Sequence, residues 1–182
     1  DSQNDDLAWT AGLPARLPGR ELILPRGDLA NFPHRPDAGP PIGLWAFEAL
    51  RVAAGQPRLG FDTDHRTIPH EVGWIGSAVH LDKGCYRGQE TVARVQNLGR
   101  PPRRLTLLQL DGTAERVPPH GSPVRAGDRQ VGFVGTASVH YELGLIALAL
   151  IKRTVDVEEI LDVDGIPAMQ ELPDGQPAVR SA

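Results

Sequence analysis

The stretch LGLIALALI, residues 143–151, is a strongly apolar run in a chain of 182 residues. Its aliphatic residues and the turn-forming residues around it predict a β-strand. RLTLLQL at 104–110 and QVGFVGTASVH at 130–140 have the same character, and turn signals at 118–121 and 126–128 separate these strands. Asp164-Gly165, between Ile160-Leu161 and Ile166, predicts a further hairpin. Several short strands with no helix between them predict a small antiparallel β-barrel over residues 101–173.

The segment from 42 to 53 has helical rather than strand periodicity. Pro41 suits the first position of a helix and Gly55 suits its end, so this segment is predicted to be helical. The apolar face of this helix is expected to contain Ile42, Trp45, Ala46, Ala49, Leu50 and Ala53. Glu48 and Arg51 lie off that face, where a solvated position is the default expectation.

The other segments before residue 100 are short and rich in loops. Residues 19–25 predict a strand stopped by Pro25, and residues 91–97 predict a second helix. Gly99-Arg100-Pro101-Pro102 would break this helix and mark a domain boundary. We therefore expect an α+β fold with a partial domain at 1–100, the barrel at 101–173 and a disordered tail at 174–182.

Composition limits the classes of function. The net charge of −4 gives no electrostatic reason for a nucleic-acid backbone to be the main partner, so direct nucleic-acid binding is not expected. No run approaches the roughly 18 apolar residues of a membrane-spanning helix, and the first residues lack the features of a signal peptide. A single cysteine, Cys85, excludes an internal disulfide. These features predict a cytoplasmic protein with no membrane association.

Cys85 lies in the segment KGCYRGQE, residues 83–90, close to Lys83 and Arg87 and just before a predicted helix. Positive charge and helix-end amides favour the thiolate, which is the reactive form of cysteine. The alternative is a small buried hydrophobic residue.

A zinc site built from Cys85 and nearby histidines is not expected. His65, His70 and His80 are separated by five and ten residues, whereas structural zinc ligands are usually paired two to four residues apart. No metal is therefore assigned to the chain.

The segment 83–90 resembles in full the signature K-G-C-Y-x-G-Q-E of the YgfZ family of folate-binding proteins. Ile68-Pro69, Val92-Ala93-Arg94 and the run 49–57 are also similar to that family, and the resemblance extends from about Gly19 to Pro173. It implies the C-terminal portion of a GcvT-like folate-binding domain at 1–100, related to the glycine cleavage T protein, followed by the barrel. An N-terminal half of the fold would complete the folate pocket.

The resemblance also implies a ligand and its contacts. Tetrahydrofolate would be the cofactor, with Cys85 as the catalytic thiol. The expected cofactor-binding residues are Arg51, Lys83, Tyr86, Gln89 and Glu90. Arg51 matches the arginine of the superfamily motif R-x-E-x-G, but Ala53 replaces its glutamate and Leu17 replaces a glutamate of the T-G-E-x-G-F-E segment.

The implied function is a tetrahydrofolate-binding accessory protein that supports iron–sulfur cluster assembly or repair and, through it, tRNA modification. Its partners would be iron–sulfur proteins or their assembly factors, because one cysteine is too few to hold a cluster alone. A folate-dependent aminomethyl or one-carbon transferase is the alternative. A third reading, an RNA-binding barrel with a basic edge at Arg100, Arg103 and Arg104, lacks aromatic stacking platforms.

Overall fold

The computed structural model describes residue 17 and residues 23–35 and 39–171. The predicted tail and most of the predicted strand at 19–25 lie outside these ranges, and residues 23–25 are irregular rather than extended in a sheet. The helical elements are η2 (Arg26–Asp28), η3 (Phe32–His34), α2 (Leu44–Ala53), η4 (Pro69–Glu71) and α3 (Gln89–Leu98). The strands are β1 (Arg103–Leu110), β2 (Pro123–Ala126), β3 (Arg129–His140), β4 (Gly144–Lys152), β5 (Leu161–Val163) and β6 (Ile166–Glu171).

The strands form a closed antiparallel barrel in the order β1-β4-β3-β2-β5-β6. The predicted barrel is confirmed, and β1, β3 and β4 match their predicted ranges to within one residue at each end. The hairpin between β5 and β6 turns at Asp164 (φ 54°) and Gly165 (φ 83°), the left-handed conformations that a tight two-residue hairpin needs. β2 was not predicted because its four residues are too few to show a period.

β4 is buried on both faces, which explains its continuous apolar sequence. Ala147, Ala149 and Ile151 point into the barrel core. Ile146, Leu148 and Leu150 belong to a second core on the outside of the barrel, with Val52 of α2 and Val72. β4 therefore contributes one face to the interior of the barrel and the other to a core that binds the preceding segment to the outside of the barrel.

β3 departs from regular pairing at two places. Its register shifts by one residue opposite Val124/Arg125 of β2, and again between Val134 and Ala137 where it pairs with β4. As a result Val131, Val134 and Ala137 all pack on the interior core although they are three residues apart. The second shift is a β-bulge that places Gly135 and Thr136 out of the regular ladder.

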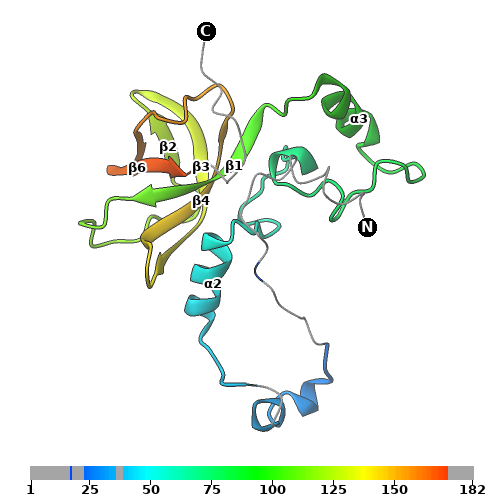
Figure 1. The fold of residues 1–182 in the computed structure, drawn as a ribbon, viewed down its shortest axis with the longest axis vertical. Helices are drawn as coiled ribbons and strands as arrows, with labels where there is room; N and C mark the ends of the chain where they lie inside the picture. Colours follow the sequence, from blue (N-terminus) through cyan, green and yellow to red (C-terminus); the bar gives the residue numbers. More distant parts are fainter. Residues whose placement is uncertain (1–16, 18–22, 36–38, 172–182) are drawn as a thin grey trace.

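Helix α2 confirms the predicted element, but its predicted apolar face is only partly buried, because Ala49 and Ala53 pack on the barrel whereas the N-terminal part of the face is exposed. Trp45 is 89% exposed and Ile42 63% exposed, whereas Val52 and Arg51 are buried. The reason is that α2 packs against β3 and β4 through its C-terminal half. Figure 1 shows α2 alongside the barrel, with α3 set apart from it beyond β1.

Candidate functional site

Arg51 lies in the last turn of α2 with its side chain 5% exposed. Nε and Nη2 donate to Glu48 Oε2 at 3.2 and 2.7 Å, and Nη1 donates to Asp62 Oδ2 at 2.8 Å. Nη1 also donates to the Gln56 carbonyl, and Nη2 donates to Thr136 Oγ1 at 2.7 Å. All five N–H donors of the guanidinium are thus occupied within the chain. Arg51 therefore holds the end of α2 to the following loop and to the bulge of β3.

Asp62 is the buried acceptor at the centre of this network. Oδ2 also accepts from the backbone N–H of Arg58 at 2.8 Å, and Oδ1 accepts from the backbone N–H of Thr136 at 2.7 Å. Its carboxylate approaches the strand closely because Gly135 has no side chain. A Cβ at Gly135 would lie 2.3 Å from Asp62 Oδ1. The bulge and its glycine thus create the place where the loop docks.

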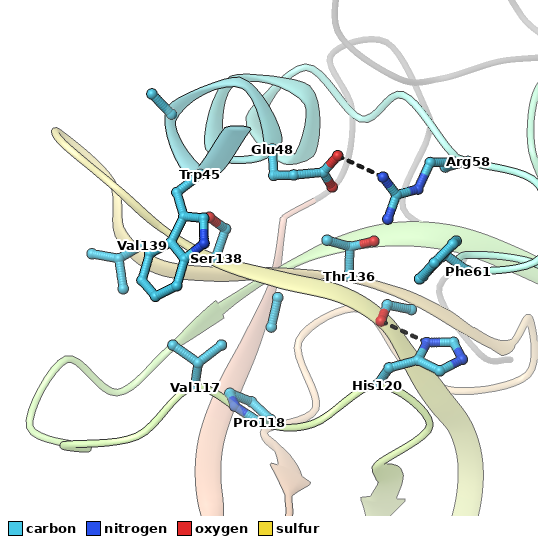
Figure 2. Close-up of a pocket in the computed structure, with 13 residues that line it drawn as sticks. Trp45, Glu48, Arg58, Phe61, Val117, Pro118, His120, Thr136, Ser138 and Val139 are labelled. Carbon is cyan, nitrogen blue, oxygen red and sulfur yellow. Dashed lines mark hydrogen bonds and ion pairs between the residues drawn. The ribbon is translucent and has the colours of Figure 1, made fainter. Parts of the chain in front are cut away.

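A cavity of about 510 Å³ lies beside this network (Figure 2). α2, the loop at 58–61, the loop at 117–120 and the bulged part of β3 surround it. Its lining consists of Trp45, Ala46, Glu48, Arg58, Phe61, Val117, Pro118, His120, Gly135, Thr136, Ala137, Ser138 and Val139. A cavity of this size, mostly apolar with a few polar groups, is typical of a small-molecule site.

Three side chains at one end of the cavity restrain one another. The Arg58 guanidinium lies 3.9 Å from the centroid of the Phe61 ring, and its Nη1 donates to Glu48 Oε1 at 2.8 Å. His120 packs at a tilt against Phe61 with 5.8 Å between ring centroids, and its Nδ1 donates to the Gly135 carbonyl at 3.0 Å. The side chains at this end of the cavity are therefore held in place by contacts with one another, without a ligand.

The segment 83–90 lies elsewhere, in the turns that precede α3. Cys85 is an exposed free thiol, so the alternative of a small buried hydrophobic residue is wrong. Lys83 Nζ lies 4.6 Å from the centroid of the Tyr86 ring. Gln89 and Glu90 form the first turn of α3, which Gly88 caps with a φ of 85°. The helix thus begins four residues after the cysteine rather than beside it.

The structure places the predicted site residues in two groups. Arg51 adjoins the cavity between α2 and the barrel, whereas Lys83, Cys85 and Tyr86 precede α3, which packs against η4. Figure 1 shows α2 and α3 on different sides of β1. The binding roles predicted for these residues stay predictions.

Arg103 fastens the loop that contains η4 to the start of β1. It donates to both oxygens of Asp64 at 2.8 and 3.1 Å and to both oxygens of Glu71 at 2.9 and 2.8 Å. Arg103 holds the pKa of Asp64 well below its usual value, and Glu71 raises the pKa of Arg103. Arg104 is buried and donates to the carbonyls of Arg153 and Val155. Arg103 and Arg104 therefore bind within the chain rather than forming an open basic edge.

The histidines considered as zinc ligands have separate environments. His70 is buried, with Nε2 hydrogen-bonded to Gln96 Oε1 at 2.9 Å, and His80 Nδ1 accepts from the Asp82 backbone N–H at 3.2 Å. In the described residues no group of three or more His, Cys, Asp or Glu side chains could hold a metal ion. Over the same ranges, no helix combines the length and apolar character needed to cross a membrane.

Most residues that line the cavity were not identified from sequence. Glu48 was expected on a solvated face, but its side chain is 14% exposed and bridges Arg51 and Arg58. The spacing of Glu48 and Arg51, three positions apart on a helix, was the available signal for their ion pair. Nothing local indicated Thr136 or His120.

Residues 103–178 match the family described as CAF17, C-terminal beta-barrel domain. An aminomethyltransferase of Herpetosiphon aurantiacus is 34% identical over 140 residues, which cover 74% of this chain and 37% of that protein. A chloroplastic protein of Arabidopsis thaliana, named as a transferase, is 33% identical over 73% of this chain and 31% of its own length.

A solved structure has the same fold. The glycine cleavage system aminomethyltransferase T from Bartonella henselae has a TM-score of 0.61 and 21% sequence identity, covering 82% of this chain and 44% of that one. The chain thus spans less than half the length of each of these three proteins. The chain is thus similar in its barrel to the CAF17 C-terminal domain, in sequence to aminomethyltransferases, and in fold to the aminomethyltransferase of the glycine cleavage system.

Proposed function

We propose that this chain is part of a tetrahydrofolate-binding protein that supports iron–sulfur cluster assembly or repair, and through it tRNA modification. The observation that carries the folate proposal is the cavity beside Arg51, in a fold shared with an aminomethyltransferase. Its volume suits part of a folate, since ligand pockets usually span about 300–1,000 Å³. Trp45 and Phe61 would contact rings of the ligand, and Arg58 would contact an anionic group.

The iron–sulfur proposal rests on the segment 83–90, whose sequence resembles the YgfZ signature. Its cysteine is exposed, so a partner or a sulfur-bearing intermediate can reach the thiol. A single thiol cannot ligate a whole cluster, so Cys85 would act on clusters held by iron–sulfur proteins or their assembly factors.

Two measurements on the full-length protein test these parts separately. Isothermal titration with tetrahydrofolate tests the ligand, and no heat of binding at saturating folate would refute it. Cells lacking the native protein and supplied with Cys85→Ala test the thiol. We expect these cells to lose activity of cluster-dependent enzymes, whereas Ser77→Ala, a change at an exposed residue of a neighbouring loop, should restore it. Equal rescue by both variants would remove the role of Cys85.

The second candidate is folate-dependent aminomethyl transfer, which the identity of 34% to a named aminomethyltransferase favours. Leu17 and Ala53 stand where the superfamily motifs have glutamates. The Leu17 carbonyl accepts from Gln56 Nε2 at 3.4 Å, so the first of these two substitutions lies next to the Arg51 network. Formation of methylenetetrahydrofolate from an aminomethyl donor would support transfer, and its absence at folate saturation would exclude it.

A further inference from the structure

Arg104 lies at the end of the barrel where the chain enters β1 from α3 (Figure 1). It is paired with Ile151 of β4, whose side chain belongs to the interior core, so Arg104 also points toward the barrel axis. Its side chain is buried; Nη1 donates to the Arg153 carbonyl at 3.0 Å, and Nη2 donates to the Val155 carbonyl at 3.1 Å and to Gln170 Oε1. Nε is a buried donor that has no acceptor in the described part of the chain. A buried donor without a partner requires an explanation, such as a bound water or ion.

Arg153 brings a second guanidinium to this end of the barrel. Its backbone N–H donates to the Pro102 carbonyl at 2.9 Å, which holds Arg153 against the start of β1. Its guanidinium makes no hydrogen bond or ion pair with the described residues, and its Nε is again a buried donor. Nε and Nη2 form the edge by which an arginine donates to two oxygens of one anion. In Arg153 this edge is free.

The positive charges at this end of the barrel repel one another. Burial and the charge of Arg153 lower the pKa of Arg104, and burial and the charge of Arg100 lower the pKa of Arg153. Asp156 opposes the first of these effects, but it forms no ion pair with an arginine in the described residues. A bound anion would therefore stabilise this cluster by neutralising charge and by accepting from the two buried Nε groups.

The surroundings of the cluster favour a compact anion. Asp156, Glu158 and Glu159 lie in the turns between β4 and β5, and the whole chain has a net charge of −4. These carboxylates would repel a nucleic-acid backbone that extended beyond the arginines. A phosphate monoester has a charge of about −1.5 to −2 at neutral pH and three acceptor oxygens, whereas a carboxylate has one charge and two oxygens. A small phosphorylated molecule thus matches the cluster best.

We propose that Arg100, Arg104 and Arg153 form a binding site for the phosphate group of a small phosphorylated molecule. The free edge of Arg153 and Nε of Arg104 donate to the phosphate oxygens, and exposed Arg100 adds charge at the entrance. The site follows the last residues of β4, whereas the cavity beside α2 adjoins the part of β3 that pairs with the first half of β4. This site goes beyond the proposed function and does not depend on it.

The test is isothermal titration of the full-length protein with inorganic phosphate. We expect phosphate to bind, whereas acetate at the same ionic strength does not. Arg153→Gln should weaken phosphate binding by about tenfold or more, the effect of losing a charge-assisted hydrogen bond. Arg129→Gln, a change at an exposed arginine of β3, should bind phosphate like wild type. The proposal is overturned if wild type does not bind phosphate or if Arg153→Gln binds it equally well.

Thermal unfolding separates a binding role of Arg153 from a structural one. Arg153→Gln removes a repelling charge, so without phosphate its melting temperature should equal or exceed that of wild type. Phosphate should raise the melting temperature of wild type but not of the variant. A variant that melts lower, together with a wild type that phosphate does not stabilise, would show a purely structural role. Arg100→Gln changes an exposed side chain and should weaken phosphate binding even if Arg153→Gln fails to fold.

Competition identifies the source of the phosphate. Pyrophosphate should displace inorganic phosphate, and tRNA should not. Displacement by tRNA that weakens with salt and is lost in Arg153→Gln would overturn the assignment to a small molecule in favour of a nucleic-acid backbone. Tetrahydrofolate should bind Arg153→Gln as it binds wild type, so failure of the phosphate site would leave the proposed function intact.

Discussion

Arg51 was predicted from a motif to bind folate, and the structure shows its five donors occupied by the chain itself. A ligand would have to replace one of these acceptors. We therefore expect Arg51→Lys to lower the free energy of unfolding by about 2 kcal/mol, because an ammonium cannot reproduce the planar fork. Urea unfolding would measure this loss, with exposed Arg125→Lys as the control. Unchanged stability with weaker folate binding would instead favour the ligand role.

Gly135 is a second residue whose identity the structure requires. Gly135→Ala would bring a Cβ to 2.3 Å from Asp62 Oδ1 and 2.7 Å from Asp62 Cα, so the loop must move away from β3. We expect a loss of about 2 kcal/mol in the free energy of unfolding, typical of overpacking. Gly112→Ala is the matched control, since a Cβ there meets nothing within 4 Å. Similar unfolding midpoints for the two variants would show that the loop adjusts freely.

At the level of single residues, the sequence singled out Arg51 as a functional arginine but did not identify the groups that accept its hydrogen bonds. Its partner Thr136 is 85 positions away, and His120 contacts Gly135 across a turn and a strand. Contacts of this kind depend on the closure of the barrel, which no local period encodes. Cys85 was predicted to be a reactive thiol from the charges of its immediate neighbours. Its exposure agrees with the turns that surround it in the structure.

Among the elements, α2 shows why a correctly predicted helix can bury only part of its predicted apolar face. Its apolar residues surround more than one side, and helical spacing alone favoured the side with the large residues Ile42 and Trp45. The surface that packs keeps Ala49 of the predicted face and adds Val52 and the paired Arg51, at the end of α2 that approaches β3 and β4. Ion pairing made a polar position buried, which a hydrophobic pattern cannot anticipate.

The loop that contains η4 should respond to acid. Arg103 holds the pKa of Asp64 below its ordinary value of 3.8, so the ionised carboxylate stabilises the folded state at and above about pH 4. This stabilisation is lost progressively as the pH falls from there toward the lower folded-state pKa. We expect the free energy of unfolding of wild type to fall more steeply than that of Asp64→Asn between about pH 4 and pH 2. Exposed Asp128→Asn should keep the wild-type slope, and equal slopes for all three would exclude the pair as an acid sensor.

For the whole molecule, the barrel was predictable because its strands are separated by strong turn signals. It was not predictable that the segment before the barrel covers the outer face of the barrel. Leu105, Leu107, Ile146, Leu148 and Leu150 of the outer barrel face are buried in the core shared with Val52 and Val72. Sequence patterns show that β4 is apolar but do not reveal that two different cores use its two faces.

A chain cut to residues 101–182 would lose the cover of that outer face. We expect it to keep the circular dichroism of a β-protein but to bind the dye ANS and to unfold with at least about 3 kcal/mol less free energy than the full chain. Charged replacement of Leu148 in the shortened chain should reduce dye binding. An equal free energy of unfolding for the two chains would mean that the shared core adds no stability.

The bulge at Gly135 and Thr136 also affects how related sequences should be aligned. One extra residue on β3 reverses which face the following residues occupy, so the bulge decides that Ala137, paired with Ala147, packs inward and that Ser138, paired with Ile146, lies on the outer face. Deleting one residue there would leave the hairpin length almost unchanged but invert the inside and outside of the strand beyond it. In a sequence alignment, a gap at this position would therefore distinguish homologues that have this wall of the cavity from homologues that lack it. An indel there is a change of binding site rather than a variation in loop length.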